Sequence, residues 1–261
     1  MKIRFAPTLR ILFLLLNFLS ALFISSCSDD NGNPSLPTRG NLLGTIQTFD
    51  DKLVSTNDRE GVTVIASNLT GQTFTSTTDN TGRYTFNDLP FDSYQFEISK
   101  TGFGTLKIFG LSHILDKDAV STIVQNITFG KISTITVTGL TFKEFILNNE
   151  IGVSFDYSLS PVPTPSNKAF VRYFLGTFAD VSNTKFKARS EVLSFSSLSA
   201  NTGFTKEKLY EMGFAAGETI YVRMYGDSFI SNNWEDPTSG NEVFPNINPT
   251  TVAAVSFVVP N

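Results

Sequence analysis

The sequence predicts an all-β protein with two tandem β-sandwich domains, placed after an export signal and a short disordered tether. Short runs rich in Thr, Val, Ile, Phe and Tyr alternate with Gly, Asn and Pro, a pattern typical of strands and turns. Charged residues form only 17% of the chain and hydrophobic residues 41%, so there is enough apolar surface to fill the cores of two sandwiches. One or two short helices are expected, such as one over residues 205–212 with Thr205 as its cap.

Residues 1–26 have the order of an export signal. Three basic residues precede an apolar run over residues 11–24, and two serines stand before Cys27. A basic start, an apolar centre and small residues at the cleavage site are typical of signal peptides. The alternative is an uncleaved membrane helix, but the run is shorter than the roughly 20 apolar residues that such a helix needs.

Residues 24–27, Ile-Ser-Ser-Cys, resemble the lipobox of bacterial lipoproteins. The resemblance implies cleavage before Cys27, and acylation of its thiol and of the new amino terminus with fatty acids such as palmitate. Several acyl chains anchor a protein stably, because each buried methylene adds about 0.8 kcal/mol. Cys27 is the only cysteine, so no disulfide is expected.

Residues 27–39 are predicted to be the lipidated cysteine and a flexible tether. Asp, Asn, Gly, Ser and Pro dominate this segment and cannot bury enough apolar area to fold. The acidic run after Cys27 resembles the export tag of surface-exposed lipoproteins in the Bacteroidota. That resemblance implies the outer membrane and the cell surface, with a periplasmic orientation left open.

Residues 40–130 are predicted to form the first sandwich. Its alternating runs are expected as strands at residues 40–49, 61–66, 73–78, 83–86 and 93–98. Alternation places the apolar side chains on one face of a sheet, and two such sheets stack as a sandwich. In the turn before the fourth run, Gly82 can adopt a positive φ, and Asp79 can accept a hydrogen bond from the backbone two residues on.

Part of this domain resembles a known family. The stretches GVTVIA and TTDNTGRYTFNDLPFDSYQFEISKTGFGT resemble the carboxypeptidase regulatory-like domain, a transthyretin-like sandwich. The shared elements are Thr-Asp-x-x-Gly-x-Tyr-x-Phe at residues 78–86 and Lys-x-Gly-Phe at residues 100–103, whereas Asp92 and Ser93 replace a glycine step of the family. The family is a non-catalytic module, so the resemblance implies scaffolding or binding.

Residues 131–261 are predicted to form the second sandwich. Its strands are expected at residues 132–137, 151–159, 169–178, 192–195, 218–225 and 252–259. Residues 217–226 resemble the sixth strand of a fibronectin type III or immunoglobulin-like domain, with Ile220 or Tyr221 near its tyrosine corner. Residues 227–250 form a long connection, and loops of this length are often functional.

Few residues offer catalytic chemistry. His113 is the only histidine, which argues against a histidine-rich metal site, and it is expected to be a surface residue in a loop. Ser182 and Lys185 match a Ser-x-x-Lys pattern, and residues 226–228, Gly-Asp-Ser, resemble a serine-esterase block; both are interpreted as chance. No catalytic residue, metal or cofactor is predicted.

The charge balance argues against nucleic acid as a partner. Residues 1–26 hold three basic and no acidic residues, which leaves 17 basic and 24 acidic residues and a net charge of −7 in the mature chain. Nucleic-acid binding depends on clustered Lys and Arg. The acidic pairs at residues 50–51, 116 and 118, and 235–236 lack the spacing of a calcium loop and are predicted to be exposed turns.

The best ligand candidate is the segment 229–237. It holds the only tryptophan, Trp234, beside Asn232, Asn233 and Glu235. An aromatic ring can stack on the C–H face of a sugar while amides and carboxylates bind its hydroxyls, so these four residues are predicted to bind carbohydrate. In the alternative, the Trp234 ring covers the open end of the sandwich and keeps its N–H at the surface.

These observations favour a lipid-anchored envelope protein that acts as a non-enzymatic binding or accessory module. Its expected partners are the membrane and either a glycan or an envelope protein. One alternative is a structural spacer or assembly subunit of a surface appendage. Another is a hydrolase with an unrecognised site near His113.

Overall fold

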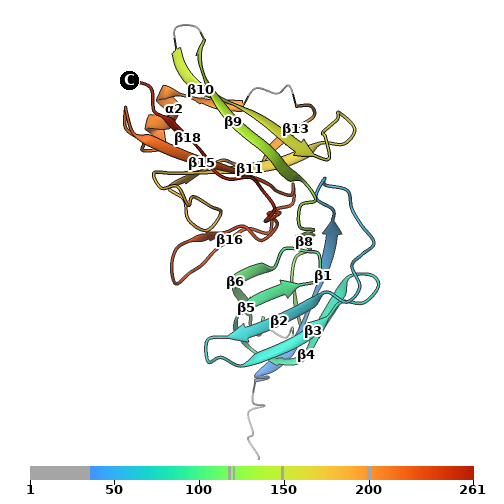
Figure 1. Cartoon of the computed structure of the whole chain (residues 1–261). Coiled ribbons are helices and arrows are strands. Elements are labelled where there is room, and N and C mark those ends of the chain that lie inside the picture. The colour runs from blue at the N-terminus through green and yellow to red at the C-terminus, as the bar shows by residue number, and fades with distance from the viewer. Residues whose placement is uncertain (1–35, 117–118, 120, 148–149, 199–201) are drawn as a thin grey trace, which may run out of the picture. The chain divides into compact units, whose positions relative to one another are not determined.

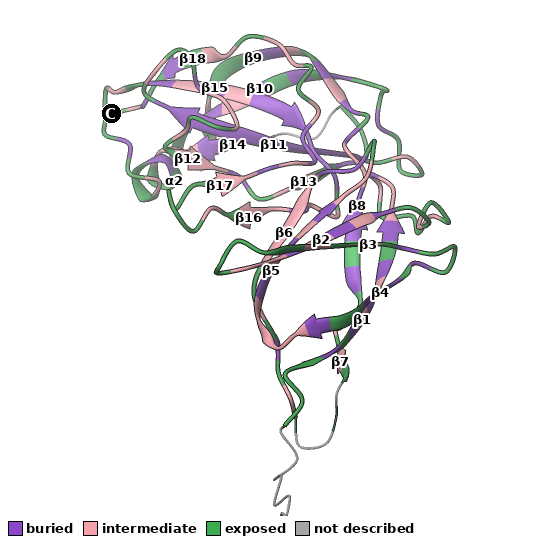
Figure 2. Ribbon diagram, turned by 90° about the horizontal axis from the view of Figure 1, so that it is seen from below, coloured by how far each residue is buried: buried purple, intermediate pink, exposed green. Residues whose placement is uncertain are grey.

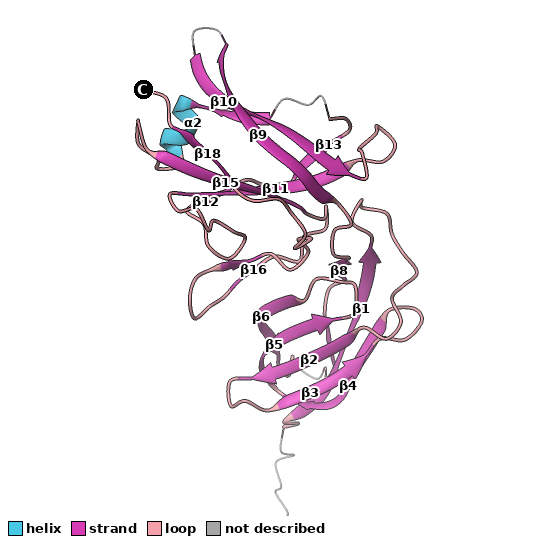
Figure 3. Cartoon of the chain, in the orientation of Figure 1, coloured by secondary structure: helices cyan, strands magenta, loops and turns pink. Residues whose placement is uncertain are grey.

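The chain is nearly all β-strand, as predicted (Figures 1 and 3). The structure is a computed structural model that describes residues 36–116, 119, 121–147, 150–198 and 202–261. The export signal, Cys27 and most of the tether lie outside these residues. Within the described part, no helix is long and apolar enough to cross a membrane. Thr38–Asn261 forms one compact unit, which contains both sandwiches.

The first sandwich consists of two sheets. The first sheet contains β4 (Arg83–Pro90), β1 (Arg39–Phe49), β7 (Ser121–Ile123) and β8 (Ile127–Gly130). In it, β1 pairs antiparallel with β4 and parallel with β7 and β8. The second sheet is antiparallel, in the order β3 (Thr73–Thr77), β2 (Thr63–Asn68), β5 (Asp92–Ser99) and β6 (Leu106–His113). The five strands predicted from alternation in this region are all present.

Alternation along β1 builds the first core. Leu42 and Ile46 are fully buried, whereas Asn41 and Gln47 face solvent. Gly44 lies between the two buried residues on the same face, where a Cβ atom would come within 2.7 Å of the Tyr84 ring. This glycine therefore leaves room for an aromatic core residue.

The predicted turn before β4 is confirmed. Gly82 has a φ of 82°. The carboxylate of Asp79 accepts hydrogen bonds from the backbone N–H groups of Thr81 at 2.8 Å and Arg83 at 3.0 Å. This Asp-to-backbone capping sets the direction in which β4 enters the sheet.

The second sandwich also has two sheets and one helix. One sheet contains β9 (Thr136–Leu147), β10 (Glu150–Ser160) and β14 (Thr202–Thr205). The other contains β12 (Ala188–Arg189), β13 (Leu193–Phe195), β11 (Ala169–Gly176), β15 (Thr219–Gly226) and β18 (Val255–Val258). The helix α2 (Lys206–Glu211) begins after Thr205, whose hydroxyl accepts the Lys208 N–H at 3.2 Å, as predicted.

The strand predicted at residues 132–137 is misplaced, because β9 begins only at Thr136. The N–H groups before it have other partners. Ser133 donates to the Asn246 carbonyl at 2.8 Å, and Thr134 donates to the Asp51 carboxylate at 2.7 Å. These bonds draw the segment out of strand pairing.

Strand β11 is buried along its whole length (Figure 2). On one face Val171, Tyr173 and Leu175 join the sandwich core. On the other face Phe174 packs in a second apolar cluster, which also contains Phe244. Residues 227–250, hereafter the outer layer, supply part of this cluster. The long connection that the sequence predicted therefore covers the second face of a sheet.

Candidate functional site

The predicted ligand segment forms a short hairpin in the outer layer. Strand β16 (Trp234–Glu235) pairs antiparallel with β17 (Glu242–Val243). Trp234 lies opposite Val243, and Glu235 lies opposite Glu242. Because neighbouring side chains of a strand point to opposite faces, the tryptophan and the two carboxylates lie on different faces of the hairpin.

The Trp234 face packs on β6 of the first sandwich. The Lys107 ammonium lies 4.9 Å from the centroid of the indole ring, and the Phe109 ring lies 5.9 Å from it. The ring is half-buried, and its N–H, expected at the surface, is buried without a hydrogen-bond partner among the described residues. The ring thus joins the two sandwiches.

Asn232 also joins the two sandwiches. It is only 2% exposed. Its side-chain N–H group donates to the Gly104 carbonyl at 2.6 Å, and its side-chain oxygen accepts the Gly130 N–H at 3.0 Å. Asn246 supports this contact, because its side chain donates to the Gly130 carbonyl at 2.8 Å. These bonds leave Asn232 no exposed amide for a ligand.

Asn233 and Glu235 have different surroundings. The side-chain oxygen of half-buried Asn233 accepts a short hydrogen bond from the Ser231 hydroxyl. Glu235 is exposed and forms no ion pair with any described residue. Glu235 therefore presents a carboxylate that has no ion-pair partner in the described chain, on the face that Trp234 does not share.

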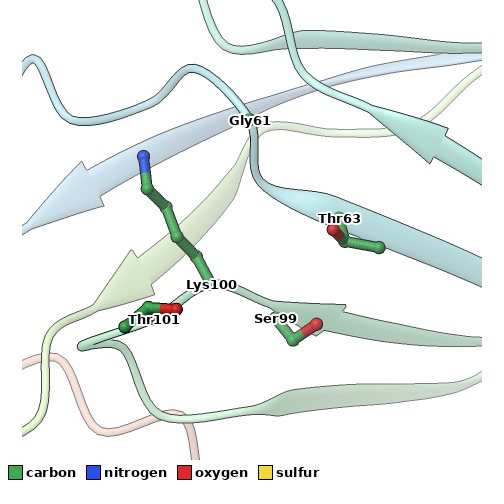
Figure 4. A pocket seen from close by; sticks show the side chains of 5 residues that line it. All are labelled: Gly61, Thr63, Ser99, Lys100 and Thr101. Carbon is green, nitrogen blue, oxygen red and sulfur yellow. The ribbon is translucent and has the colours of Figure 1, made fainter.

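A polar hollow lies in the first sandwich, away from the predicted ligand segment (Figure 4). It encloses about 540 Å³ and is lined by Gly61, Thr63, Ser99, Lys100 and Thr101. The Lys100 ammonium is already bound, by the Asp58 carboxylate at 2.6 Å and the Glu60 carbonyl at 2.6 Å. Hydrogen bonds from Lys100 and then Lys131 hold the pKa of Asp58 below its ordinary value. Lys100 therefore holds the loop that contains Asp58 and Glu60.

His113 is buried, so its prediction as a surface residue is wrong. It ends β6 with 0% exposure. Its Nε2 lies 3.2 Å from the Leu89 carbonyl, and its Nδ1 lies 2.7 Å from the Thr122 hydroxyl. A carbonyl can only accept, so Nε2 is the donor to Leu89, while the Thr122 hydroxyl is the hydrogen-bond partner of Nδ1. Both ring nitrogens are thus used within the first sandwich.

The other residues that match catalytic patterns also have partners within the fold. The Asp227 carboxylate forms a buried ion pair with Arg172 at 2.8 Å, and the Ser228 hydroxyl donates to the Lys131 carbonyl at 2.6 Å. In the Ser-x-x-Lys match, Lys185 pairs with Asp180 at 2.7 Å. These contacts give each residue a structural partner.

The described members of the acidic pairs have separate surroundings in the fold. Asp51 was predicted to be exposed but is buried, and its carboxylate accepts both the N–H and the hydroxyl of Thr134. Asp236 caps the hairpin turn by accepting the N–H groups of Thr238 and Ser239, each at 2.9 Å. Asp118 lies outside the described residues. Within the described part of the chain, no three His, Cys, Asp or Glu residues are grouped to hold a metal ion.

Three solved structures are distantly similar to this chain. A cohesin–X-dockerin complex from Acetivibrio cellulolyticus is 20% identical, with 36% of this chain and 59% of that chain covered and a TM-score of 0.29. A candidate carbohydrate binding protein from Bacteroides uniformis is 16% identical over 84% of this chain and 98% of that chain, with a TM-score of 0.27. The major pilin subunit BcpA of Bacillus cereus is 11% identical over 85% and 69%, with a TM-score of 0.30.

No curated protein matches the sequence. A family model does match the region where the sequence resemblance was found. Residues 53–129 match the carboxypeptidase regulatory-like domain.

Proposed function

We propose that this chain is a lipid-anchored protein of the bacterial cell envelope whose two β-sandwiches act as a non-enzymatic binding module. The observation that carries the proposal is the position of the residues with catalytic potential. His113, Asp227 and Ser228 are all buried, and each is hydrogen-bonded within the fold. The match to a regulatory-like domain at residues 53–129 supports the same role.

The anchor is proposed from the sequence of the first 39 residues. The basic start, the apolar run and the Ile-Ser-Ser-Cys motif support acylation at Cys27. In this proposal the tether ends near residue 39 and is followed by domains at residues 40–130 and 131–261. The acidic run after Cys27 favours the outer membrane, with the sandwiches facing outward.

Metabolic labelling with radioactive palmitate tests the anchor. The wild-type chain should incorporate label and sediment with membranes. The variant Cys27→Ser should lose both properties, because it lacks the thiol that is acylated. Ser28→Ala, a matched change one residue further on, should keep both. Labelled Cys27→Ser protein, or an unlabelled wild-type chain, would contradict the anchor.

A second candidate function is an assembly subunit of a surface appendage, and one feature favours it. Ile146 and Ile151 lie opposite each other near the end of the β9–β10 hairpin, and Ile146 is 75% exposed. Paired apolar side chains at the surface suit a protein contact. If they form one, Ile146→Asp should abolish any oligomer that the wild-type chain shows in sedimentation. A monomeric wild-type chain would rule against this role.

A further inference from the structure

We propose that the carboxylate face of the β16–β17 hairpin binds a neutral glycan, in a pocket within the second sandwich and its outer layer. This inference rests on the proposed binding function and specifies its ligand. The pocket encloses about 360 Å³ and is lined by Thr184, Lys185, Phe186, Gly240, Asn241 and Glu242. Its volume lies within the range of roughly 300–1,000 Å³ that small-ligand pockets occupy.

Phe186 supplies an apolar surface in this pocket. Its ring is half-buried and packs against the rings of Phe174, at a centroid distance of 5.0 Å, and Phe244, at 5.8 Å. The ring is therefore held in place by the second apolar cluster. A rigid aromatic face with its negative quadrupole can stack on the C–H groups of a pyranose ring.

Glu242 supplies oriented acceptors. Arg189 binds its carboxylate in a bidentate manner, with distances of 2.7 Å from Nε to Oε2 and 2.6 Å from Nη2 to Oε1. These hydrogen bonds lower the pKa of Glu242, so the carboxylate is ionised at neutral pH. Each carboxylate oxygen has a second lone pair, which can accept a hydrogen bond from a sugar hydroxyl.

Asn241 and Thr184 supply further hydrogen-bonding groups around the pocket. Both residues are exposed. The backbone of Asn241 closes the hairpin turn, by accepting the Asp236 N–H at 2.9 Å, while its side-chain amide has no partner among the described residues. In the described chain, the one hydrogen-bond partner of the Thr184 hydroxyl is the Ser182 hydroxyl, at 3.2 Å. An amide and a hydroxyl can each donate to and accept from vicinal sugar hydroxyls.

The charge around the pocket selects against acidic sugars. Lys185 is paired with Asp180, and Arg189 is paired with Glu242 and Glu191. Glu235 has no such partner in the described chain, and its carboxylate lies 4.0 Å from the position of a Cβ atom on Gly240. An unpaired carboxylate beside the pocket repels uronate and sialate groups.

The Trp234 face is the less suitable surface. Its ring is contacted by Lys107 and Phe109, and the neighbouring Asn232 amide is buried. The sequence analysis predicted that a sugar would bind at Trp234. The pocket lies on the other face of the same hairpin, and Glu235 lies beside it.

Affinity electrophoresis of the full chain in detergent tests this inference. Native gels contain dextran, mannan, xylan or polygalacturonate. At least one of the three neutral polymers should slow the wild-type chain, and polygalacturonate should not. Asn241→Ala and Thr184→Ala should each weaken the affinity about three- to tenfold, the effect of one lost hydrogen bond. Both residues are exposed, so neither change should disturb the fold.

Two further variants sharpen the test. Ser99→Ala lies in the separate hollow of the first sandwich (Figure 4) and should bind as the wild type does. Glu235→Gln should gain retardation by polygalacturonate, because it removes the unpaired negative charge. Migration unaffected by all three neutral polymers would overturn the inference, while palmitate labelling of Cys27 would still support the anchored protein. Retardation that survives both Asn241→Ala and Thr184→Ala would overturn the pocket but leave a binding module.

Discussion

The two sandwiches differ in how many faces of a sheet they bury. Strand β1 of the first sandwich alternates between buried and exposed residues, whereas all eight residues of β11 in the second sandwich are buried. The cause is the outer layer, which adds a second apolar cluster on the far face of β11. Because the outer layer covers the far face of β11, both faces of this strand are buried and its residues do not alternate between buried and exposed.

The same difference appears in the ion pairs. In the first sandwich, the side chains of the Arg39–Asp88 pair are 46% and 76% exposed. In the second sandwich, those of the Arg172–Asp227 pair are 2% and 0% exposed. Arg172 also donates to the Ser190 carbonyl at 2.9 Å. The outer layer thus buries a charged pair that a simple two-sheet sandwich would leave in water.

The largest expected effect comes from breaking this buried pair. Arg172→Ala should lower the free energy of unfolding by about 3–5 kcal/mol, because it leaves the Asp227 carboxylate buried without its partner. Arg39→Ala, the matched change in the first sandwich, should cost less than about 1 kcal/mol. Urea denaturation of both variants gives the comparison. Equal losses would show that the outer layer does not isolate Asp227 from solvent.

The next effect concerns the contact between the outer layer and the first sandwich. Asn246→Ala removes hydrogen bonds to the carbonyls of Gly130 and Lys131, and one from the Asn232 N–H. Because several buried polar groups lose partners, the free energy of unfolding should fall by about 2–3 kcal/mol. The exposed Asn241→Ala is the control and should change it little. A loss below about 1 kcal/mol for Asn246→Ala would mean that water replaces these bonds.

A smaller effect is expected from pH. The pKa of Glu242 is lowered, first by its hydrogen bonds from Arg189. Its contribution to stability is therefore present above its ordinary pKa of 4.5 and is lost as the pH falls through the lower folded value. Glu242→Gln should cost under about 1 kcal/mol at pH 7, because the pair is partly exposed. The difference from the wild type should shrink as the pH falls below 4.5, and a constant difference in thermal unfolding would contradict this.

The smallest effect is expected in the first core. The Tyr84 hydroxyl is buried without a partner in the described chain, and burial raises its pKa. Tyr84→Phe removes a desolvated polar group and keeps the ring, so stability should stay equal or rise by up to about 1 kcal/mol. Thermal unfolding is the measurement. A clear destabilisation would reveal a hydrogen bond to an ordered water.

Parts of the first sandwich were predictable because their chemistry is local. The turn at Asp79 and Gly82 and the five predicted strands depend on neighbours a few residues away, and these were found, whereas β6, β7 and β8 were not predicted. The contacts of His113, Asp51 and Asn232 depend on residues far along the chain. The spacing of residues in the sequence does not predict such distant hydrogen-bond partners. His113 and Asp51 were therefore wrongly predicted to be exposed.

The candidate site shows the same limit. The sequence prediction and the proposed pocket share one segment, since Glu235 lies on the hairpin that borders the pocket. It could not separate the two faces of that hairpin, because the register of Glu235 with Glu242 is known only once β16 and β17 pair. The partners from residues 184–186 lie about 50 residues earlier. Nothing local in that stretch of sequence marks them as part of a pocket.

The most direct test of an outward-facing, lipid-anchored binding module is protease digestion of intact cells that express the full chain. Digestion of the membrane-bound wild-type protein from outside is the predicted result. Cys27→Ser serves as the unanchored control, and it should be absent from the membrane fraction before protease is added. Protection of the wild-type protein until the outer membrane is broken would contradict the account and place the sandwiches in the periplasm.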